Sequence, residues 1–250
     1  QADGLTFTAS GETDGGLTIS VSQVIDNGTL DDMSISVATD AMGTITVHGK
    51  DGSSALGAVD DVMPTAYEEP WFGVTSPTKV DGKAGNGMFQ YTSPSVGGAT
   101  ITATYSQADG TIVESQTAYA IAFSPEMVDG LEIGYAFGET EATAGTVIDD
   151  QTYYVKYSYG PITVGYQESE SDAPTAAASD ESETFGISYQ VTDDFSVSYN
   201  THDYNDGAWT SDEEYSGVSA SYTMGGITIA GHVNELSNKG GSATAADVEG

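Results

Sequence analysis

Two acidic pairs have the type and spacing for a chemical role: Asp60 with Asp61, and Glu68 with Glu69. Neighbouring carboxylates attract cations and repel anions where they line a narrow, water-filled passage. Their oxygens are also the ligands that Ca²⁺ prefers. Most acidic runs, however, are simply solvated. Apolar side chains such as Trp71 lie among and after the pairs, which favours packing of this segment against a wall.

Metal and enzymatic chemistry have less support in the sequence. There is no twelve-residue calcium loop and no Gly/Asp nonapeptide repeat, so a structural Ca²⁺ stays open with its ligands unassigned, and no cofactor is required. His48, His202 and His232 are far apart, cysteine is absent, and no Gly-x-Ser-x-Gly motif is present. We therefore expect that the protein is not an enzyme.

The charge balance limits the partners. The 250 residues contain 5 Lys plus Arg against 38 Asp plus Glu, which gives a formal net charge of −33. Such a chain is not expected to bind nucleic acid, whose phosphates require cationic side chains, or to use a polybasic membrane-surface mode. Without cysteine there is no disulfide framework and no thiolate metal site.

Apolar residues alternate with small or polar ones along most of the chain, which is the period of a β-strand with one apolar and one polar face. Short turns such as 192–194 alternate with long acidic links such as 168–182, 203–214 and 25–32. Strands of about ten residues with this rhythm are typical of a transmembrane β-barrel. The predicted strands are 5–10, 17–22, 33–37, 45–47, 88–93, 99–107, 117–124, 131–139, 151–160, 162–168, 184–191, 195–203, 215–223 and 227–235.

The alternation stops between about Gly49 and Asn86, and the C-terminal stretch 236–250 is polar without an apolar ending. A long segment without periodicity inside a compact fold is usually functional or disordered. Leu56, Trp71 and Phe72 lie within this one, so we expect it to pack. The whole chain, 1–250, is read as one domain, with 50–86 as a loop inside it.

Two stretches carry a resemblance to a known family. Ser10-Gly11-Glu12-Thr13-Asp14-Gly15-Gly16-Leu17 resembles the first tight turn of the general diffusion porins of α-proteobacteria. Gly43-Thr44-Ile45-Thr46-Val47-His48-Gly49, with Ala55-Leu56-Gly57-Ala58, resembles the strand and start of the long third loop in that family. The resemblance implies a sixteen-stranded, trimeric barrel in which this loop folds inward and narrows the pore. It also implies that this chain lacks the first and last strands; a complete fourteen-stranded barrel is the competing hypothesis.

The resemblance and the residues together predict an all-β outer-membrane porin of a Gram-negative bacterium. It would pass small hydrophilic solutes and ions by diffusion, contact membrane lipid, form a homotrimer and prefer cations. Asp60, Asp61, Glu68 and Glu69 would line the constriction, and Glu132 and Lys156 the lumen wall. The family usually places arginines opposite the acidic loop, and this chain has none. The alternative is a soluble, acidic all-β cell-surface or adhesin protein that binds Ca²⁺.

Alternation also predicts which side chains share a face of each strand. The residues expected to point outward are Ile19, Ile35, Ile133, Val164, Ile187 and Val197. Those expected to point inward are Thr18, Ser34, Glu132, Thr163, Ser188 and Ser198.

Overall fold

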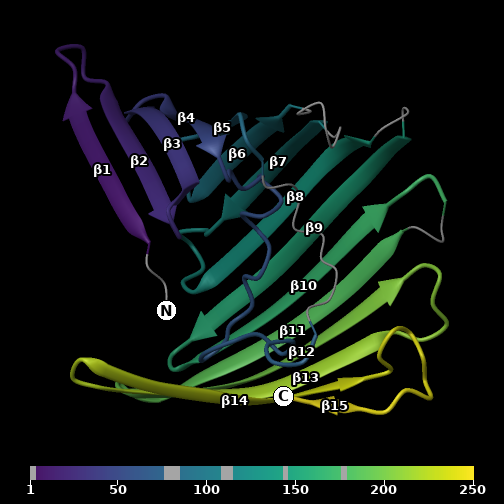
Figure 1. Ribbon diagram of the computed structural model, residues 1–250. Helices are drawn as coiled ribbons and strands as arrows, with labels where there is room; N and C mark the ends of the chain where they lie inside the picture. The colour runs from purple at the N-terminus through teal and green to yellow at the C-terminus, as the bar shows by residue number, and fades with distance from the viewer. Residues whose placement is uncertain (1–3, 76–84, 108–114, 143–145, 176–178) are drawn as a thin grey trace. The chain divides into compact units, whose positions relative to one another are not determined.

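The computed structural model describes residues 4–75, 85–107, 115–142, 146–175 and 179–250. Within these ranges the chain forms fifteen strands, which hydrogen-bond to one another in chain order, with antiparallel pairing from β1 to β7 and from β10 to β15 (Figure 1). The strands are β1 (Leu5–Glu12), β2 (Thr18–Asp26), β3 (Thr29–Thr39), β4 (Gly43–Lys50), β5 (Met88–Thr92), β6 (Ala99–Ser106), β7 (Ser115–Phe123), β8 (Leu131–Ala142), β9 (Thr146–Tyr159), β10 (Ile162–Asp172), β11 (Asp180–Thr192), β12 (Phe195–Asp206), β13 (Glu213–Met224), β14 (Ile227–Ser237) and β15 (Val248–Glu249). Among the described residues there is no helix long and apolar enough to cross a membrane.

All fourteen strands predicted from the alternation are present as β1 to β14, with ends that differ by a few residues. The sequence missed β15, whose two residues pair with Glu235 and Leu236 of β14. A two-residue strand is too short to show a period, so its position depends on its partner.

The predicted long acidic link at 25–32 is wrong. β2 continues to Asp26, which pairs directly with Thr29, so that only Asn27 and Gly28 form the turn. Both have positive φ, 48° and 76°. Asn-Gly is the preferred sequence for a two-residue hairpin turn in which both central residues adopt this conformation.

Two other acidic links are shorter than expected because the strands continue into them. β10 extends to Asp172 and β11 begins at Asp180, and β12 extends to Asp206. Glu168 and Glu183 face each other across the β10–β11 pair. The acidic composition of these segments therefore led to the prediction of loops, although their backbone pairs with neighbouring strands.

The chain divides into two compact units. Unit 1 consists of Gln1–Val59, Asp81–Phe123 and Tyr135–Asp150, and unit 2 consists of Asp60–Val80, Ser124–Gly134 and Gln151–Gly250. The boundaries pass through β8, β9 and the long loop, by which we mean residues 51–87. The prediction of a single domain, with residues 50–86 as a loop inside it, remains a prediction; residues 76–84 of that loop lie outside the described ranges.

In unit 1 the strands β1 to β6 carry hydroxyl and amide groups along one face. One cross-strand row on this face consists of Ser10, Ser20, Ser36, Thr46, Gln90 and Thr104. The opposite face holds apolar side chains that are about half exposed, such as Phe7, Ile45 and Ile101. Ile19 and Ile35 are on this apolar face, and Thr18 and Ser34 are on the polar one.

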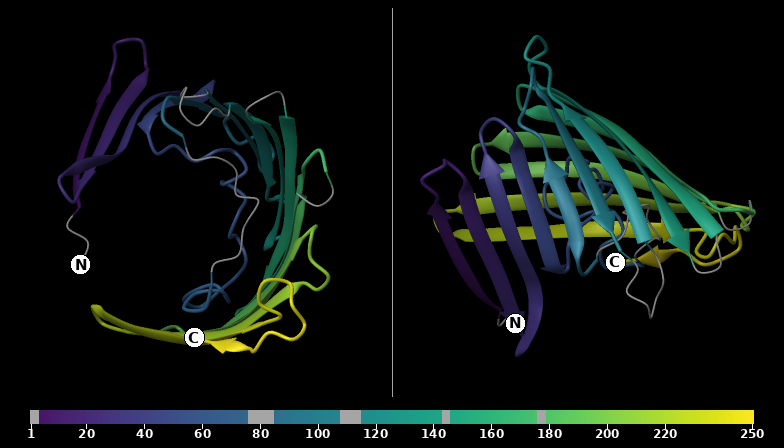
Figure 2. Two further views of the ribbon diagram at one scale, coloured as in Figure 1. Left: turned by 45° about the vertical axis from the view of Figure 1, so that its right-hand side comes forward. Right: turned by 90° about the horizontal axis from the view of Figure 1, so that it is seen from above.

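Unit 2 has the same two-faced sheet over β10 to β14. Its apolar face includes the directly paired row Val164, Ile187, Tyr199, Val218 and Val233. Its polar face is covered in part by residues 60–74 of the long loop, which lie along one side of these strands (Figure 2). A small buried cluster of Trp71, Tyr215 and Leu236 forms where the loop meets the sheet.

Candidate functional site

The polar face of unit 2 presents one cross-strand row to the loop. Gly165, Gly186, Asn200, Gly217 and Asn234 are direct partners from β10 through β14. We call these five residues the Gly/Asn row. Direct partners in a sheet lie about 5 Å apart, so the row runs across the strands as a continuous band of three glycines and two asparagines.

The glycines of this row give the loop room to approach the backbone of the sheet. A Cβ on Gly165 would come 2.7 Å from Cδ of Pro64 and 2.8 Å from Sδ of Met63. A Cβ on Gly186 would come 3.0 Å from the same Cδ of Pro64. Such distances are below van der Waals contact, so any larger residue at Gly165 or Gly186 would displace the loop.

The two asparagines of the row bind carbonyl groups of the loop. Nδ2 of Asn200 donates to the carbonyl of Pro64 at 3.0 Å. Nδ2 of Asn234 donates to the carbonyl of Glu69 at 3.1 Å and to that of Phe72 at 2.8 Å. This part of the loop does not pair as a strand, so its backbone carbonyl groups need hydrogen-bond donors from side chains of the sheet.

A second row, next to the first on the same face, binds the loop through hydroxyls. The amide of Ala66 donates to Oγ of Ser198 at 3.0 Å. Oγ1 of Thr65 lies 3.5 Å from Oγ of Ser198 and 3.4 Å from Oγ of Ser219. These two serines are direct cross-strand partners and bond each other at 2.8 Å.

Aromatic contacts complete the docking of the loop. The indole of Trp71, which is only 8% exposed, meets the His202 ring edge-on with centroids 4.8 Å apart. Nδ1 of His202 is bonded to the Thr184 hydroxyl at 2.7 Å. Tyr67 and Phe72 contact the ring of His232, 6.0 and 5.0 Å between centroids. The expected burial of Trp71 or Phe72 thus holds for Trp71, whereas Phe72 is half exposed.

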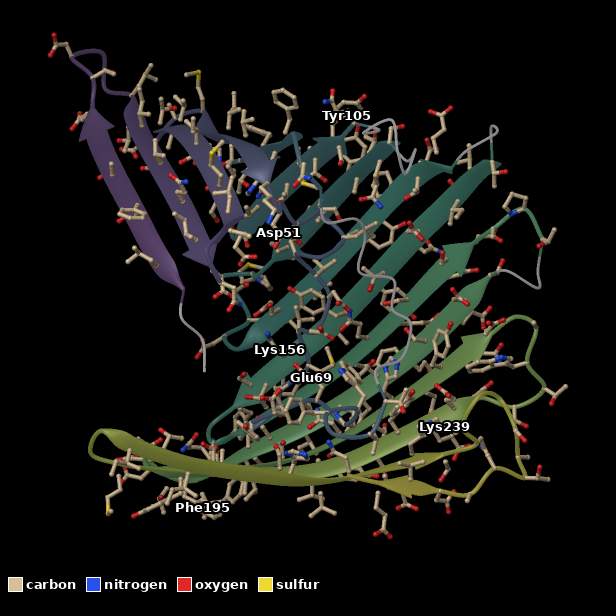
Figure 3. All side chains as sticks on the ribbon, in the orientation of Figure 1. Asp51, Glu69, Tyr105, Lys156, Phe195 and Lys239 are labelled. Carbon is tan, nitrogen blue, oxygen red and sulfur yellow. The ribbon has the colours of Figure 1, made fainter. Side chains whose placement is uncertain are left out.

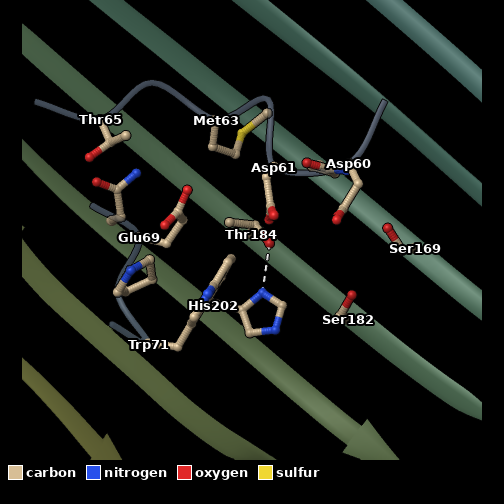
Figure 4. A pocket seen from close by; sticks show the side chains of 13 residues that line it. Asp60, Asp61, Met63, Thr65, Glu69, Trp71, Ser169, Ser182, Thr184 and His202 are labelled. Carbon is tan, nitrogen blue, oxygen red and sulfur yellow. Dashed lines mark hydrogen bonds between the residues drawn. The ribbon is translucent and has the colours of Figure 1, made fainter. Parts of the chain in front are cut away.

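The loop brings its carboxylates to a pocket on the polar face. Asp60, Asp61 and Glu69 line it together with hydroxyl and amide groups of the sheet (Figure 4). The sheet supplies Gln167, Ser169, Ser182, Thr184, Asn200 and His202. Glu68, the fourth predicted acid, is half-buried and does not line this pocket. Three of the four predicted acids therefore share one site, whose role at a constriction remains a prediction.

Glu132 and Lys156 form a second charged group on the polar face of unit 2. Their side chains make an ion pair of 3.3 Å between Nζ of Lys156 and Oε1 of Glu132, and the Tyr154 hydroxyl donates to the same carboxylate at 2.7 Å. The three side chains share one face, as alternation predicts. The opposite charges of Lys156 and Glu132 largely cancel, so this pair contributes little to the electrostatic potential along the polar face.

Many acids of unit 2 lie on the other face of the sheet, near the strand ends. Glu168, Glu170, Glu181 and Glu183 alternate with the loop-facing residues of β10 and β11 and border a shallow acidic depression. Hydroxyls of Tyr153 and Tyr166 donate to Glu168. Figure 3 places Phe195 on this side of unit 2 and Glu69 on the other. The net charge of the chain is therefore a poor guide to the charge on the polar face.

The first part of the long loop docks on unit 1. The amide of Ala55 donates to Oγ1 of Thr104 at 3.0 Å, on the polar face. Leu56 is fully buried, and a Cβ on Gly138 would lie 3.0 Å from its Cδ1. Ala55, Leu56 and Val59 make up the buried apolar part of this segment.

The model of the Gram-negative porin family matches residues 1–241 of the chain. The chain belongs to this family. Its solved neighbours include the anion-selective porin of Comamonas acidovorans, with 14% identity over 94% of this chain and 78% of that one and a TM-score of 0.72. No curated protein matches.

Other porins have the same fold. The outer-membrane-expressed OmpT of Vibrio cholerae matches at 13% identity and a TM-score of 0.69, with 98% of this porin and 85% of that chain covered. A mutant of the Rh. blastica porin matches at 16% identity and a TM-score of 0.67, with 92% of this chain and 83% of that chain covered. The predicted all-β porin fold and the Gram-negative outer-membrane location are thus confirmed.

The sequence did not single out the residues that hold the loop. Asn200, Asn234, Ser198 and Ser219 are ordinary polar residues of alternating strands, and their importance depends on the register between strands. The one available signal was spacing: each asparagine lies two residues from a histidine on the same face, in Asn200-Thr201-His202 and His232-Val233-Asn234. By itself this pattern indicates no contact with the loop.

Proposed function

We propose that this porin passes small hydrophilic solutes and ions by passive diffusion, with a preference for cations set by the long loop. The observation that supports this proposal is the docking of residues 60–74 on the polar face, which places Asp60, Asp61 and Glu69 around one pocket. Carboxylates in a narrow, low-dielectric passage focus a negative potential. The family is one of channels, and the proposal includes no enzymatic step.

The polar face suits uncharged solutes as well. The row from Ser10 to Thr104 in unit 1 consists of hydroxyl and amide groups, which exchange hydrogen bonds with water and with hydroxylated solutes alike. The charge that decides ion selectivity is then concentrated on the loop. The neighbour from Comamonas acidovorans is described as anion-selective, so the proposed cation preference rests on the acids of the loop and not on the fold.

We further propose that the apolar faces contact membrane lipid and that the porin forms a homotrimer. Half-exposed side chains such as Phe7, Ile101 and Val218 support the first proposal. One OmpT structure of Vibrio cholerae is described as a trimer form, which supports the second. The family assignment leaves the soluble adhesin hypothesis without support. A structural Ca²⁺ remains a proposal without ligands, because the described residues contain no group of three or more candidate side chains.

Planar-bilayer recording tests the function. Under a KCl gradient, the reversal potential should indicate K⁺ preference, and the preference should weaken at high salt because screening shortens to about 3 Å at 1 M. A variant without residues 60–74 should conduct more and lose most of the preference. Anion preference of the intact porin at low salt would reject the cation proposal, and unchanged conductance after the deletion would reject the role of the loop.

A further inference from the structure

The residues that fix the position of the loop carbonyls lie on the sheet. Asn200 holds Pro64, and Asn234 holds both Glu69 and Phe72. These three carbonyls border the acidic part of the loop: Pro64 follows Asp60 and Asp61 by a few residues, and Glu69 is itself one of the acids.

We propose that Asn200 and Asn234 are positioning residues that set the ion selectivity and the conductance of this porin by holding the loop on the polar face. This inference rests on the proposed function, in which the loop carries the selectivity. It adds that two neutral wall residues, which contribute no charge to the pore, control where the charges lie.

Asparagine is suited to this task because its side chain offers two N–H donors on one nitrogen. Asn234 uses them for two carbonyls three residues apart. The carbonyl of Glu69 also accepts the amide of Phe72 at 3.1 Å, so Asn234 closes both ends of a tight turn. The backbone of Glu69 is thereby held at two points, so its carboxylate can move only by rotation within its own side chain.

The neighbouring glycines make the two bonds possible. Gly186 and Gly217 lie on either side of Asn200 in the Gly/Asn row. A Cβ on Gly217 would lie 3.1 Å from Cα of Pro70, and one on Gly186 would lie 3.1 Å from the carbonyl oxygen of Pro64. The loop therefore approaches the sheet closely enough for short asparagine side chains to reach its carbonyls.

The test compares Asn200→Leu, Asn234→Leu and the double variant with Asn205→Leu. Asn205 is on the same strand as Asn200 but on the opposite face, where its side chain bonds Asp212. In folded, heat-modifiable protein, the double variant should raise single-channel conductance and reduce the K⁺ over Cl⁻ permeability ratio at least twofold. Asn205→Leu should change neither. Asn200→Ala and Asn234→Ala, which remove the amide without adding bulk, replace the leucine variants if those do not fold.

A reversible cross-link separates loop position from other effects. The chain has no cysteine, and Oγ1 of Thr65 lies 3.4 Å from Oγ of Ser219, so a Thr65→Cys/Ser219→Cys pair can tie the loop to β13. Added to the double asparagine variant, the oxidised pair should restore conductance and selectivity, and dithiothreitol should abolish the rescue. The same pair on the otherwise unchanged porin, oxidised and reduced, is the control.

Two results would overturn the proposal. One is unchanged conductance and selectivity in the folded double variant. The other is an altered channel that the oxidised cross-link does not restore, because the effect would then arise elsewhere. The rate at which the cysteine pair oxidises reports loop docking independently of selectivity. If the intact porin is not cation-selective, the proposed function fails, while a slower oxidation in the double variant still supports the positioning role.

Discussion

The indole of Trp71 and the imidazole of His202 meet edge to face, 4.8 Å apart, although 131 positions separate them in the chain. Trp71 also belongs to a small buried cluster with Tyr215 and Leu236, and the ring of Tyr215 in turn lies 5.7 Å from that of His202. This cluster explains how a segment rich in acids stays against a sheet. Its apolar burial opposes the repulsion among the carboxylates.

Replacing Trp71 by Ala should release residues 60–74 from the sheet. Removing a buried Trp side chain costs about 3–5 kcal/mol, which is large compared with the net contribution of a few hydrogen bonds. Phe72→Ala is the matched control, because Phe72 is adjacent but 45% exposed. Single-channel recordings should show higher, noisier conductance for Trp71→Ala and a much smaller change for Phe72→Ala. Equal effects would mean that the cluster does not hold the loop.

Removing the charges of the loop acids should weaken cation preference without unfolding the protein. The variant is Asp60→Asn, Asp61→Asn, Glu68→Gln and Glu69→Gln. Its control removes four charges from the other face: Glu168→Gln, Glu170→Gln, Glu181→Gln and Glu183→Gln. Both variants change the net charge equally, so the reversal potential separates local from overall charge. Exposed charges act weakly beyond about 8–10 Å in physiological salt, and a shift of equal size in the control would contradict the assignment.

A larger side chain at Gly186 should push the loop away from the Gly/Asn row. Gly186→Val places atoms where Pro64 now lies, and overpacking of this kind costs about 1–3 kcal/mol. Gly231→Val on β14 is the control, because no atom lies within 4 Å of a Cβ at that position. Protease cleavage within the loop should become faster in Gly186→Val only. Equal cleavage rates in both variants would argue against close packing.

The sequence predicted the strands because their period depends only on which side chains face water. Phe195 to Asn200 alternate visibly, and β12 lies where the alternation places it. It missed the Asn27-Gly28 turn because acidic neighbours suggested a longer link, although the dipeptide itself is a hairpin signal. For the same reason the predicted ranges of β10 and β11 were too short at their acidic ends.

The candidate site was predicted only in part. Asp60, Asp61 and Glu69 were identified from their charge and from the apolar residues around them, and they do share a pocket. The strand residues that hold the loop were not predicted. Asn200 and Asn234 become partners of the loop through the register of three strand pairs. Turn geometry sets the register of each hairpin, but the contact of these asparagines with the loop joins residues 136 and 165 positions apart, which no local pattern encodes.

Arginine substitutions at two adjacent positions of β10 should have opposite consequences. Val164 belongs to the apolar row with Ile187 and Tyr199, whereas Thr163 is on the polar face, paired with Ser188. If the apolar face meets lipid, Val164→Arg near the bilayer midplane should destabilise the fold by about 2–4 kcal/mol. Thr163→Arg leaves its charge in water and should mainly lower cation conductance. Urea unfolding in detergent micelles and bilayer recordings measure the two effects. Similar losses of stability in both variants would show that the two faces do not have these environments.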